Sequence, residues 1–330
     1  MLFNKTLIIG LGLIGGSFAK TLRKNNLSAQ IIGCDIDEEA INLASLEKVI
    51  DNGFGDLQVL SAEELNEFDL IVIAAPLAAY EEIFEEISKT KSLVIDLGSV
   101  KNFDFQNSPQ NFVPCHPIAG LENAGFENSR DDLFENKKFI ICKKDEKVSQ
   151  LIKEIGAQEE FLESEKHDEI YALVSHLPQF LSFLTAKFSP ENITNDFVKN
   201  AFRLDYSDGE IWGDIFAMNE ENVEKFYIEF FENIMEVAEN NFIKINQDFS
   251  SQEATKINLE DIASKEILVR LIVVLSYLKI KKINEFSSFA GSGFRDFTSL
   301  ALQVNFDERS VNLLLQEHKE FFEKFIQSIS

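Results

Sequence analysis

The feature that most constrains the fold is a glycine-rich turn at the start of the chain. A short apolar run, Thr6-Leu7-Ile8-Ile9, is followed by glycines in the spacing G-x-G-x-x-G, and the next apolar residues recur at helical spacing. In such a turn the first glycine permits a tight bend, the second lets the backbone approach a pyrophosphate, and the third lets the helix pack on the strand. The phosphates would lie at the helix N-terminus. The predicted cofactor contacts here are Gly10, Gly12, Leu13, Ile14 and Gly15.

A carboxylate follows this turn at a distance typical of dinucleotide sites. Asp35 ends a second apolar run, about 20 residues beyond the last glycine, where a ribose-binding acid belongs. The next four residues, Ile-Asp-Glu-Glu, contain no arginine that could accept a 2′-phosphate. The sequence therefore predicts NAD rather than NADP. Glycines that serve packing alone are the alternative, and the ordered strand, turn, helix, strand and acid argue against it.

Strands and helices alternate through the first half of the chain. Further strands are predicted at 68–76, 92–97, 112–117 and 138–142. This alternation is typical of an α/β protein with a Rossmann-like, doubly wound parallel sheet, which binds ligands beyond the carboxyl ends of its strands. Ala75, Pro76, Ser99 and His116 each lie at or just past a strand end. We expect them to converge on one crevice, with Ala75, Pro76 and Ser99 near the cofactor.

The second half reads as helices. Apolar stripes at helical spacing predict helices at 169–187, 222–237, 266–278 and 309–329. The third is apolar nearly all round, which predicts burial between other helices. We therefore expect an NAD-binding domain over residues 1–163 and an all-α substrate and dimerisation domain over 164–330, with a homodimer formed through the helices.

Charge and cysteine content narrow the function class. The 330 residues carry a formal net charge of −25, which argues against nucleic acid or an anionic membrane as partner. An anionic substrate would need basic residues concentrated at its site. Cys34, Cys115 and Cys142 fit neither a zinc site nor a disulfide framework, so we expect free thiols, no metal and a cytoplasmic protein. No leader is expected before the first strand, and the most apolar stretch, 267–278, is too short to span a bilayer.

Several further motifs follow the glycine turn in a fixed order. They are Gly98-Ser99-Val100-Lys101, His116-Pro117-Ile118-Ala119-Gly120-Leu121-Glu122, His167-Asp168, Ser175-His176-Leu177-Pro178, Arg203-Leu204, Ser207-Asp208 and Trp212-Gly213-Asp214-Ile215-Phe216. Over residues 1–240 the chain thereby resembles the prephenate dehydrogenase family, which includes arogenate dehydrogenases. The resemblance implies a step of tyrosine biosynthesis, the oxidative decarboxylation of prephenate to 4-hydroxyphenylpyruvate. NAD accepts a hydride from the ring carbon that bears the hydroxyl group, and loss of carbon dioxide aromatises the ring.

The family pattern assigns catalytic roles to three residues. His116 is expected to be the general base, since the pKa of imidazole lies near neutral pH. Ser99 is expected to be its hydrogen-bond partner near the nicotinamide, and His176 to position the substrate. The structural alternatives are a loop cap for His116 and a buried, hydrogen-bonded histidine for His176. His167 could cap a helix, and His318 could be a packing or interface residue.

The expected substrate is a dianion, so cationic ligands are predicted. Arg203 is expected to bind a carboxylate, because its planar guanidinium suits a bidentate contact. Lys101 and Arg295 are further candidates, with a solvated surface side chain as the alternative for Lys101.

The chain departs from the family pattern in its helical half. Gln179 stands where the family usually has histidine, and Leu121 replaces a usual threonine. The run G-G-G-F-[KR]-D-F-T that normally precedes the arginine is missing before Arg203, where residues 198–202 read Val-Lys-Asn-Ala-Phe.

A close copy of the missing run lies near the C-terminus. Residues 290–298 read Ala-Gly-Ser-Gly-Phe-Arg-Asp-Phe-Thr, and Ser299 takes the place of the arginine. Each version is preceded by a helix and followed by a phenylalanine-rich helix. We interpret residues 164–240 and 262–330 as a degenerate duplication, for which chance similarity of helical segments is the alternative.

Three other functions stay open at this level. One is an arogenate dehydrogenase of the same chemistry. Another is a reductase of the β-hydroxyacid dehydrogenase kind, which would use a helix-borne lysine in place of His116. The third is a catalytically silent NAD-binding protein, suggested by the divided motif.

Overall fold

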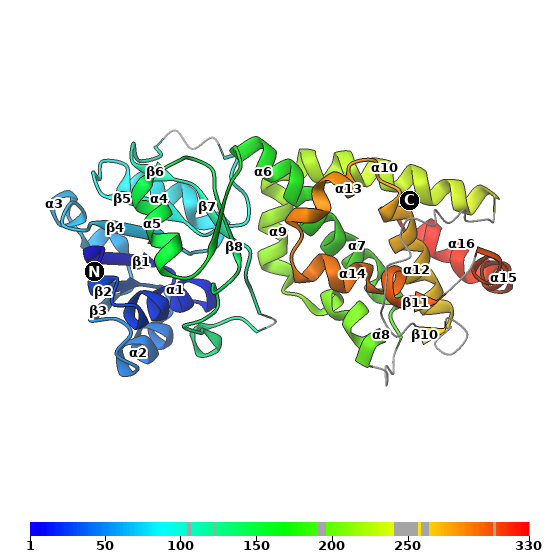
Figure 1. The fold of residues 1–330 in the computed structure, drawn as a ribbon, viewed down its shortest axis with the longest axis horizontal. Helices are drawn as coiled ribbons and strands as arrows, with labels where there is room; N and C mark the ends of the chain where they lie inside the picture. The colour runs from blue at the N-terminus through cyan, green and yellow to red at the C-terminus, as the bar shows by residue number, and fades with distance from the viewer. Residues whose placement is uncertain are drawn as a thin grey trace. The chain divides into compact units, whose positions relative to one another are not determined.

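The computed structural model describes residues 1–103, 107–121, 123–190, 196–240, 257–258, 264–305 and 308–329. Glu122, part of the His116 motif, lies outside these residues. The chain divides into two compact units (Figure 1). The first comprises Met1–Asp168 with Gly209–Met218, and the second comprises Glu169–Asp208 with Asn219–Ser330.

The first unit is built on a six-stranded parallel sheet. Its strands are β1 (Phe3–Ile9), β2 (Ser28–Cys34), β3 (Asn52–Phe54), β4 (Leu70–Ile73), β5 (Leu93–Asp96) and β6 (Phe112–Val113). They lie in the order β3-β2-β1-β4-β5-β6. The chain therefore winds outward from β1 in one direction and then, from β4 onward, in the other. This arrangement confirms the predicted Rossmann-like sheet and places a ligand crevice beyond β1 and β4.

Two hydrophobic cores cover the two faces of this sheet. One includes side chains of α1 (Leu13–Lys24), α2 (Glu38–Leu46) and α5 (Glu146–Glu154). The other includes side chains of α4 (Tyr80–Ile87) and Ile215 of α9 (Gly209–Met218). Successive residues of a strand point to opposite faces, so β1 contributes Ile8 to the first core and Leu7 and Ile9 to the second.

The predicted strand 112–117 is divided between two sheets. Residue 114 is proline, which has no N–H to donate, and the chain leaves the parallel ladder there. The next strand, β7 (Cys115–Pro117), pairs antiparallel with β8 (Lys138–Ile141), which pairs parallel with β9 (Gln158–Phe161). His116 thus sits on a strand of this second sheet, directly after the last strand of the first.

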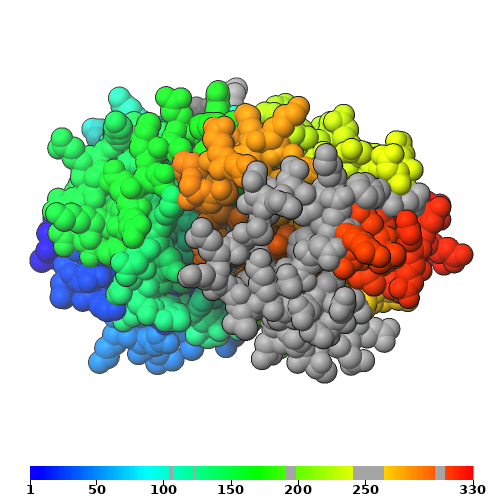
Figure 2. Space-filling view, turned by 45° about the vertical axis from the view of Figure 1, so that its right-hand side comes forward, coloured from blue at the N-terminus to red at the C-terminus, as the bar shows by residue number. Residues whose placement is uncertain are grey.

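The second unit is predominantly helical, as predicted. Its principal elements are α6 (Ser164–Tyr171, which begins in the first unit), a π-helical turn (Ala172–His176), α7 (Leu177–Thr185), α8 (Asp196–Ala201), the 3-10 turn η6 (Arg203–Tyr206), α10 (Glu220–Asn240), α12 (Lys265–Leu278), α13 (Ile283–Phe286), α14 (Ser292–Gln303), α15 (Glu308–Glu317) and α16 (Lys319–Ile329). A short parallel pair, β10 (Ile257–Asn258) and β11 (Val304–Asn305), accompanies them. Every residue from Ile267 to Leu278 in α12 is buried, which confirms the expectation for this helix. In Figure 2, α15 and α16 (red) lie below α10 (yellow), and α16 packs against α10.

The last predicted helix is not continuous. It is interrupted at His318 into α15 and α16. The backbone N–H of His318 still donates to the Leu314 carbonyl, and the backbone N–H of Phe322 donates to the His318 carbonyl. The interruption is therefore a local distortion that periodicity does not reveal. None of the described helices combines the length and apolar character that crossing a bilayer requires.

Candidate active site

The three glycines of the first turn differ in what their missing side chains allow. Gly10 has φ +91°, and a Cβ there would lie 2.6 Å from the Ala74 carbonyl oxygen at the end of β4. A Cβ on Gly15 would lie 1.9 Å from the Gly10 carbonyl oxygen. Around Gly12, by contrast, a Cβ would meet no described atom within 4 Å. The first and third glycines thus allow the tight packing of turn, strand and helix, while the second leaves open space above the backbone.

The N-terminus of α1 is prepared for an anion. Its N-cap, Gly12, provides no side-chain hydrogen bond, and its first turn contains no acidic residue. In the same unit, α2 and α5 are capped by the carboxylates of Asp37 and Asp145 and carry glutamate in their first turns. An uncapped N-terminus leaves backbone N–H groups and the positive end of the helix dipole for an external negative group.

Asp35 lies beside the glycine turn. One carboxylate oxygen accepts a hydrogen bond from the Leu11 N–H, and the other accepts one from the Asp37 N–H at 2.8 Å. The side chain therefore stands at the carboxyl end of β2 with its orientation fixed. Ala75 and Pro76 follow β4, the neighbour of β1. The structure thus brings the predicted cofactor residues together at the carboxyl ends of the parallel strands.

His116 belongs to a hydrogen-bonded chain of three side chains. Its Nδ1 lies 2.9 Å from Nε2 of His167, and Nδ1 of His167 lies 2.6 Å from Oδ1 of Asp168. The Asp168 carboxylate also accepts the backbone N–H groups of Lys101 at 2.8 Å and Asn102 at 2.6 Å. His167 is completely buried, whereas His116 is partly exposed. His167 therefore does not cap the helix, since its ring joins His116 to Asp168.

Burial determines the protonation states of the His167 and His116 rings. Burial, with a smaller contribution from the positive charge of Lys101, holds the pKa of His167 well below its usual value, so the ring is neutral near pH 7. Asp168 accepts the Nδ1–H of His167, so Nε2 of that ring is an acceptor. Neutral His116 must then donate from Nδ1 and carry its lone pair on Nε2. A histidine in this tautomer can act as a general base through Nε2.

A buried ion pair supports both ends of the chain of side chains. The Lys101 ammonium contacts the Asp96 carboxylate, and both side chains are fully buried. Asp96 also accepts the N–H of Cys115, the residue before His116, at 2.9 Å. Since the backbone N–H of Lys101 binds Asp168, the pair links the two segments that hold the histidines. Burial raises the pKa of Asp96, and the Lys101 charge opposes that shift.

Two predicted site residues have surroundings that differ from the expectation. Lys101 is not a solvated surface side chain, because its ammonium is enclosed against Asp96. Ser99 follows β5 as expected, but the described partner of the His116 ring is His167, and Ser99 makes no hydrogen bond to His116. The roles of Lys101 toward substrate and of Ser99 toward His116 stay predictions.

The second unit holds the remaining predicted residues. His176 is buried at the end of the π-helical turn, with its Nδ1 3.1 Å from Nδ2 of Asn219. Such turns are frequent at functional sites. Arg203, on η6, is partly buried and binds Asp296 through Nε at 3.0 Å and through a terminal nitrogen. Arg295, on α14, is exposed and makes no salt bridge in the described part of the chain.

Gln179, where the family usually has histidine, holds the Arg203 segment. It is buried, its Nε2 donates to the Leu204 carbonyl at 2.7 Å, and its Oε1 accepts from the Ser207 hydroxyl at 3.1 Å. One bond is to the backbone of the residue after Arg203 and the other is to the Ser207 side chain, so both hold the segment that carries Arg203. A neutral histidine could also donate once and accept once, which gives this replacement a physical reason.

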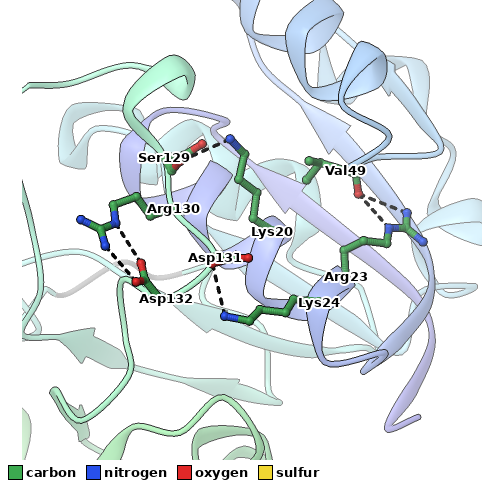
Figure 3. A pocket seen from close by; sticks show the side chains of 8 residues that line it. All are labelled: Lys20, Arg23, Lys24, Val49, Ser129, Arg130, Asp131 and Asp132. Atoms are coloured by element: carbon green, nitrogen blue, oxygen red, sulfur yellow. Dashed lines mark hydrogen bonds and ion pairs between the residues drawn. The ribbon is translucent and has the colours of Figure 1, made fainter.

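A shallow pocket of about 540 Å³ lies at the far end of α1 from the glycine turn (Figure 3). Its lining includes four cationic side chains, and each is paired with a carboxylate: Lys20 with Glu47, Arg23 with Asp51, Lys24 with Asp131 and Glu135, and Arg130 with Asp132. This balance of charge does not favour a bound anion. The described residues contain no group of histidine, cysteine and acidic side chains placed to hold a metal ion.

Comparison with known proteins places both parts of the chain in one family. A family model described as prephenate dehydrogenase, nucleotide-binding domain, matches residues 18–166, and one described as prephenate dehydrogenase, dimerization domain, matches residues 163–251. The solved structure of prephenate dehydrogenase from Aquifex aeolicus in complex with hydroxyphenyl propionate and NAD+ is 33% identical. That match covers 72% of this chain and 90% of the other, with a TM-score of 0.61.

Two curated relatives match over shorter stretches. Prephenate dehydrogenase of Lactococcus lactis is 31% identical over 190 residues, which are 54% of this chain and 52% of that protein. Prephenate dehydrogenase of Bacillus subtilis is 29% identical over 244 residues, covering 66% of this chain and 64% of that protein. The chain thus spans about half to two thirds of the length of these relatives.

Proposed function

We propose that this chain, which belongs to the prephenate dehydrogenase family, is an NAD-dependent dehydrogenase that converts prephenate to 4-hydroxyphenylpyruvate in tyrosine biosynthesis. The observation that carries the proposal is the chain of hydrogen bonds from Asp168 through His167 to His116. It supplies an oriented base in the same unit as a glycine turn suited to a dinucleotide.

NAD fits the residues of the first unit. The uncapped N-terminus of α1 and the open space at Gly12 suit the pyrophosphate, and Asp35 suits the adenosine ribose. When bound, NAD accepts the hydride from the ring carbon of the substrate. A carboxylate at the end of β2 disfavours a 2′-phosphate, so NAD is preferred to NADP.

His116 performs the proton chemistry. Its Nε2 accepts the proton of the substrate hydroxyl as that carbon loses its hydride, and the carbon becomes a ketone. Loss of carbon dioxide then returns an electron pair to the ring, and the oxygen takes a proton as the phenol forms. The positive charge that develops on His116 is stabilised through neutral His167 by the Asp168 carboxylate.

Arg203 and His176 serve the substrate, with Arg203 on a carboxylate and His176 in a positioning role. The Arg203 guanidinium is held by Asp296, and Gln179 fixes the neighbouring chain through its hydrogen bonds to the Leu204 carbonyl and the Ser207 hydroxyl. Ser99 lies at the end of β5, near the expected nicotinamide position. Lys101 acts here as a positioning residue, because its ammonium is enclosed against Asp96; Arg295 is an additional candidate cation.

The assembly and location are proposed from the family and the composition. Residues 1–163 would form the NAD-binding domain and residues 164–330 the helical domain. The helical surface matched by the dimerization model is expected to pair with an equivalent surface, in a second chain or within this one. Buried or half-buried free thiols at Cys34, Cys115 and Cys142 favour a cytoplasmic location.

A steady-state assay tests the proposal directly. Purified protein is supplied with prephenate or arogenate and with NAD or NADP, and formation of the reduced cofactor is followed. Turnover with prephenate and NAD supports the proposed activity, and turnover with arogenate alone would instead establish the first alternative. Binding of NAD without turnover of either substrate would establish the silent NAD-binding protein.

A further inference from the structure

The C-terminal part of the chain packs against the helical segment that resembles it. The first repeat comprises α7, α8, η6 and α10, and the second comprises α12, α14, α15 and α16. All of these elements belong to the same compact unit. The second repeat lies beyond residue 251, where the dimerization model ends.

Corresponding helices of the two repeats touch one another. The divided run places α8 opposite α14 in the duplication, and these two helices pack together. The phenylalanine-rich helices that follow, α10 and α16, also pack together, and Tyr227 Oη donates to the Ile329 carbonyl at 2.8 Å. The helices that precede the run, α7 and α12, are joined by a hydrogen bond from Arg270 to Ser182 at 3.0 Å. Contact of three elements with their own counterparts is what a two-fold, self-complementary interface produces for elements close to its axis.

A buried arginine of the second repeat contacts residues of both repeats. Arg270, on α12, is fully buried and forms an ion pair with Asp205, on η6 in the first repeat. Its guanidinium lies 4.6 Å from the ring centre of Phe202 in the first repeat and 5.7 Å from that of Phe297 in the second. A buried charge is costly without its ion-pair partner. Separation of the two repeats would therefore leave the charges of Arg270 and Asp205 unpaired.

The second repeat also reaches the arginine proposed for substrate binding. Asp296, from the glycine-rich run on α14, binds Arg203 on η6. The glycine-rich run that is missing before Arg203 in the sequence therefore contacts Arg203 from the C-terminal copy.

We infer that the C-terminal repeat takes the place of a second subunit's helical domain, so that a single chain builds the paired helical structure that other chains of the family build as dimers. In this arrangement Asp296 is a positioning residue for Arg203 supplied by the second repeat. The first statement rests on the family and the helical packing alone, and the second rests on the proposed function.

The inference is tested first by mass, without reference to activity. Sedimentation of the full chain over a wide range of protein concentration should give the mass of one chain, 37.5 kDa, throughout. A particle of twice that mass that persists on dilution would overturn the inference, because a second chain would then be the helical partner. This result is independent of whether the protein turns over prephenate.

The positioning role of Asp296 is tested by substitution. Asp296→Asn should raise KM for prephenate by roughly 2- to 10-fold, the scale of moderate coupling between contacting residues, with kcat and NAD affinity little changed. In an Arg203→Ala background the same substitution should have no further effect on KM. Glu320→Gln, an exposed acid on α16, is the matched control. Equal effects of Asp296→Asn with and without Arg203 would show that Asp296 does not act through that arginine.

Discussion

His116 and His167 stand 51 residues apart in the sequence, yet Nδ1 of the first lies 2.9 Å from Nε2 of the second. The strand β7 presents one ring and the helix α6 presents the other. Because Asp168 accepts the remaining N–H of His167, the carboxylate determines which nitrogen of His116 carries the lone pair. In the proposed mechanism the base is thus oriented by groups that need never contact the substrate.

Removal of the His116 imidazole should abolish most of the turnover. His116→Asn is expected to lower kcat by roughly 10²–10⁴-fold, the usual loss for a general base. The affinity for NAD, measured by fluorescence titration, should change little because the glycine turn and Asp35 are untouched. His318→Asn, between α15 and α16, is the matched histidine control. An unaltered kcat would remove His116 from the mechanism.

Asp168→Asn should disable the base without removing it. The amide can donate to Nδ1 of His167, which moves the ring proton to Nε2 and reverses the hydrogen bond to His116. Nε2 of His116 would then be protonated, and we expect kcat to fall by at least about tenfold, as for a general base held in the wrong state. Asp145→Asn, at the cap of α5, is the control for loss of a carboxylate. A variant with the wild-type kcat and pH profile would exclude the proposed tautomer.

His167 should also make the stability of the first unit depend on pH. Its pKa is well below the ordinary value in the folded protein and returns to about 6.5 in the unfolded chain. Between these two values the unfolded chain binds a proton that the folded protein does not. The free energy of unfolding should therefore fall by up to about 1.4 kcal/mol for each pH unit below about 6.5. Above that pH the histidine contributes no slope.

Denaturant unfolding of the wild type and of His167→Asn measures this contribution. A loss of stability that is equal at every pH does not affect the test, because the comparison concerns the slope between about pH 6.5 and 5, above the range of ordinary carboxylates. The wild type should lose stability more steeply than the variant as the pH falls. Parallel curves would mean that His167 binds its proton as readily in the folded protein as in the unfolded chain.

The sequence predicted the sheet because its signals are local. The spacing of Gly10, Gly12 and Gly15 and the acid at Asp35 each follow from how one strand joins one helix. The division of strand 112–117 could have been anticipated from Pro114, which removes a ladder donor. The polar strand β9, by contrast, has no apolar run to reveal it, since its residues are Gln, Glu, Glu and Phe.

The site was less accessible to prediction because its partners are remote in sequence. His116 was identifiable from its neighbours, but its bond to His167 depends on where α6 meets β7. The adjacent pair His167-Asp168 was visible as a motif, and a helix cap was an equally good reading of it. Asp296 and Gln179 became recognisable as supports of Arg203 when the packing of η6 was known.

The carboxylate of Asp35 should determine the choice of cofactor. Wild-type protein is expected to prefer NAD to NADP, because a 2′-phosphate would face this negative charge. Asp35→Ala should bring the kcat/KM values for NAD and NADP closer together, mainly by weakening the binding of NAD. Asp37→Asn, which keeps a cap for α2, is the neighbouring control. Equal use of NAD and NADP by the wild type would make the assignment of Asp35 wrong.

Arg203 and Arg295 should differ in their importance for substrate binding. Arg203 is partly buried, paired with Asp296 and held on a turn anchored by Gln179, whereas Arg295 is exposed on α14. A charge-assisted contact to a carboxylate contributes about 1.5–3 kcal/mol, or roughly 10- to 150-fold in binding. Arg203→Ala should raise KM for prephenate by that factor and leave NAD affinity unchanged.

Arg295→Ala tests whether the second copy supplies a further cation for the dianion. If it raises KM by a similar factor, both repeats serve the substrate. If it has wild-type kinetics and alters thermal stability alone, the C-terminal copy acts through Asp296 and packing, and Arg203 alone binds the carboxylate.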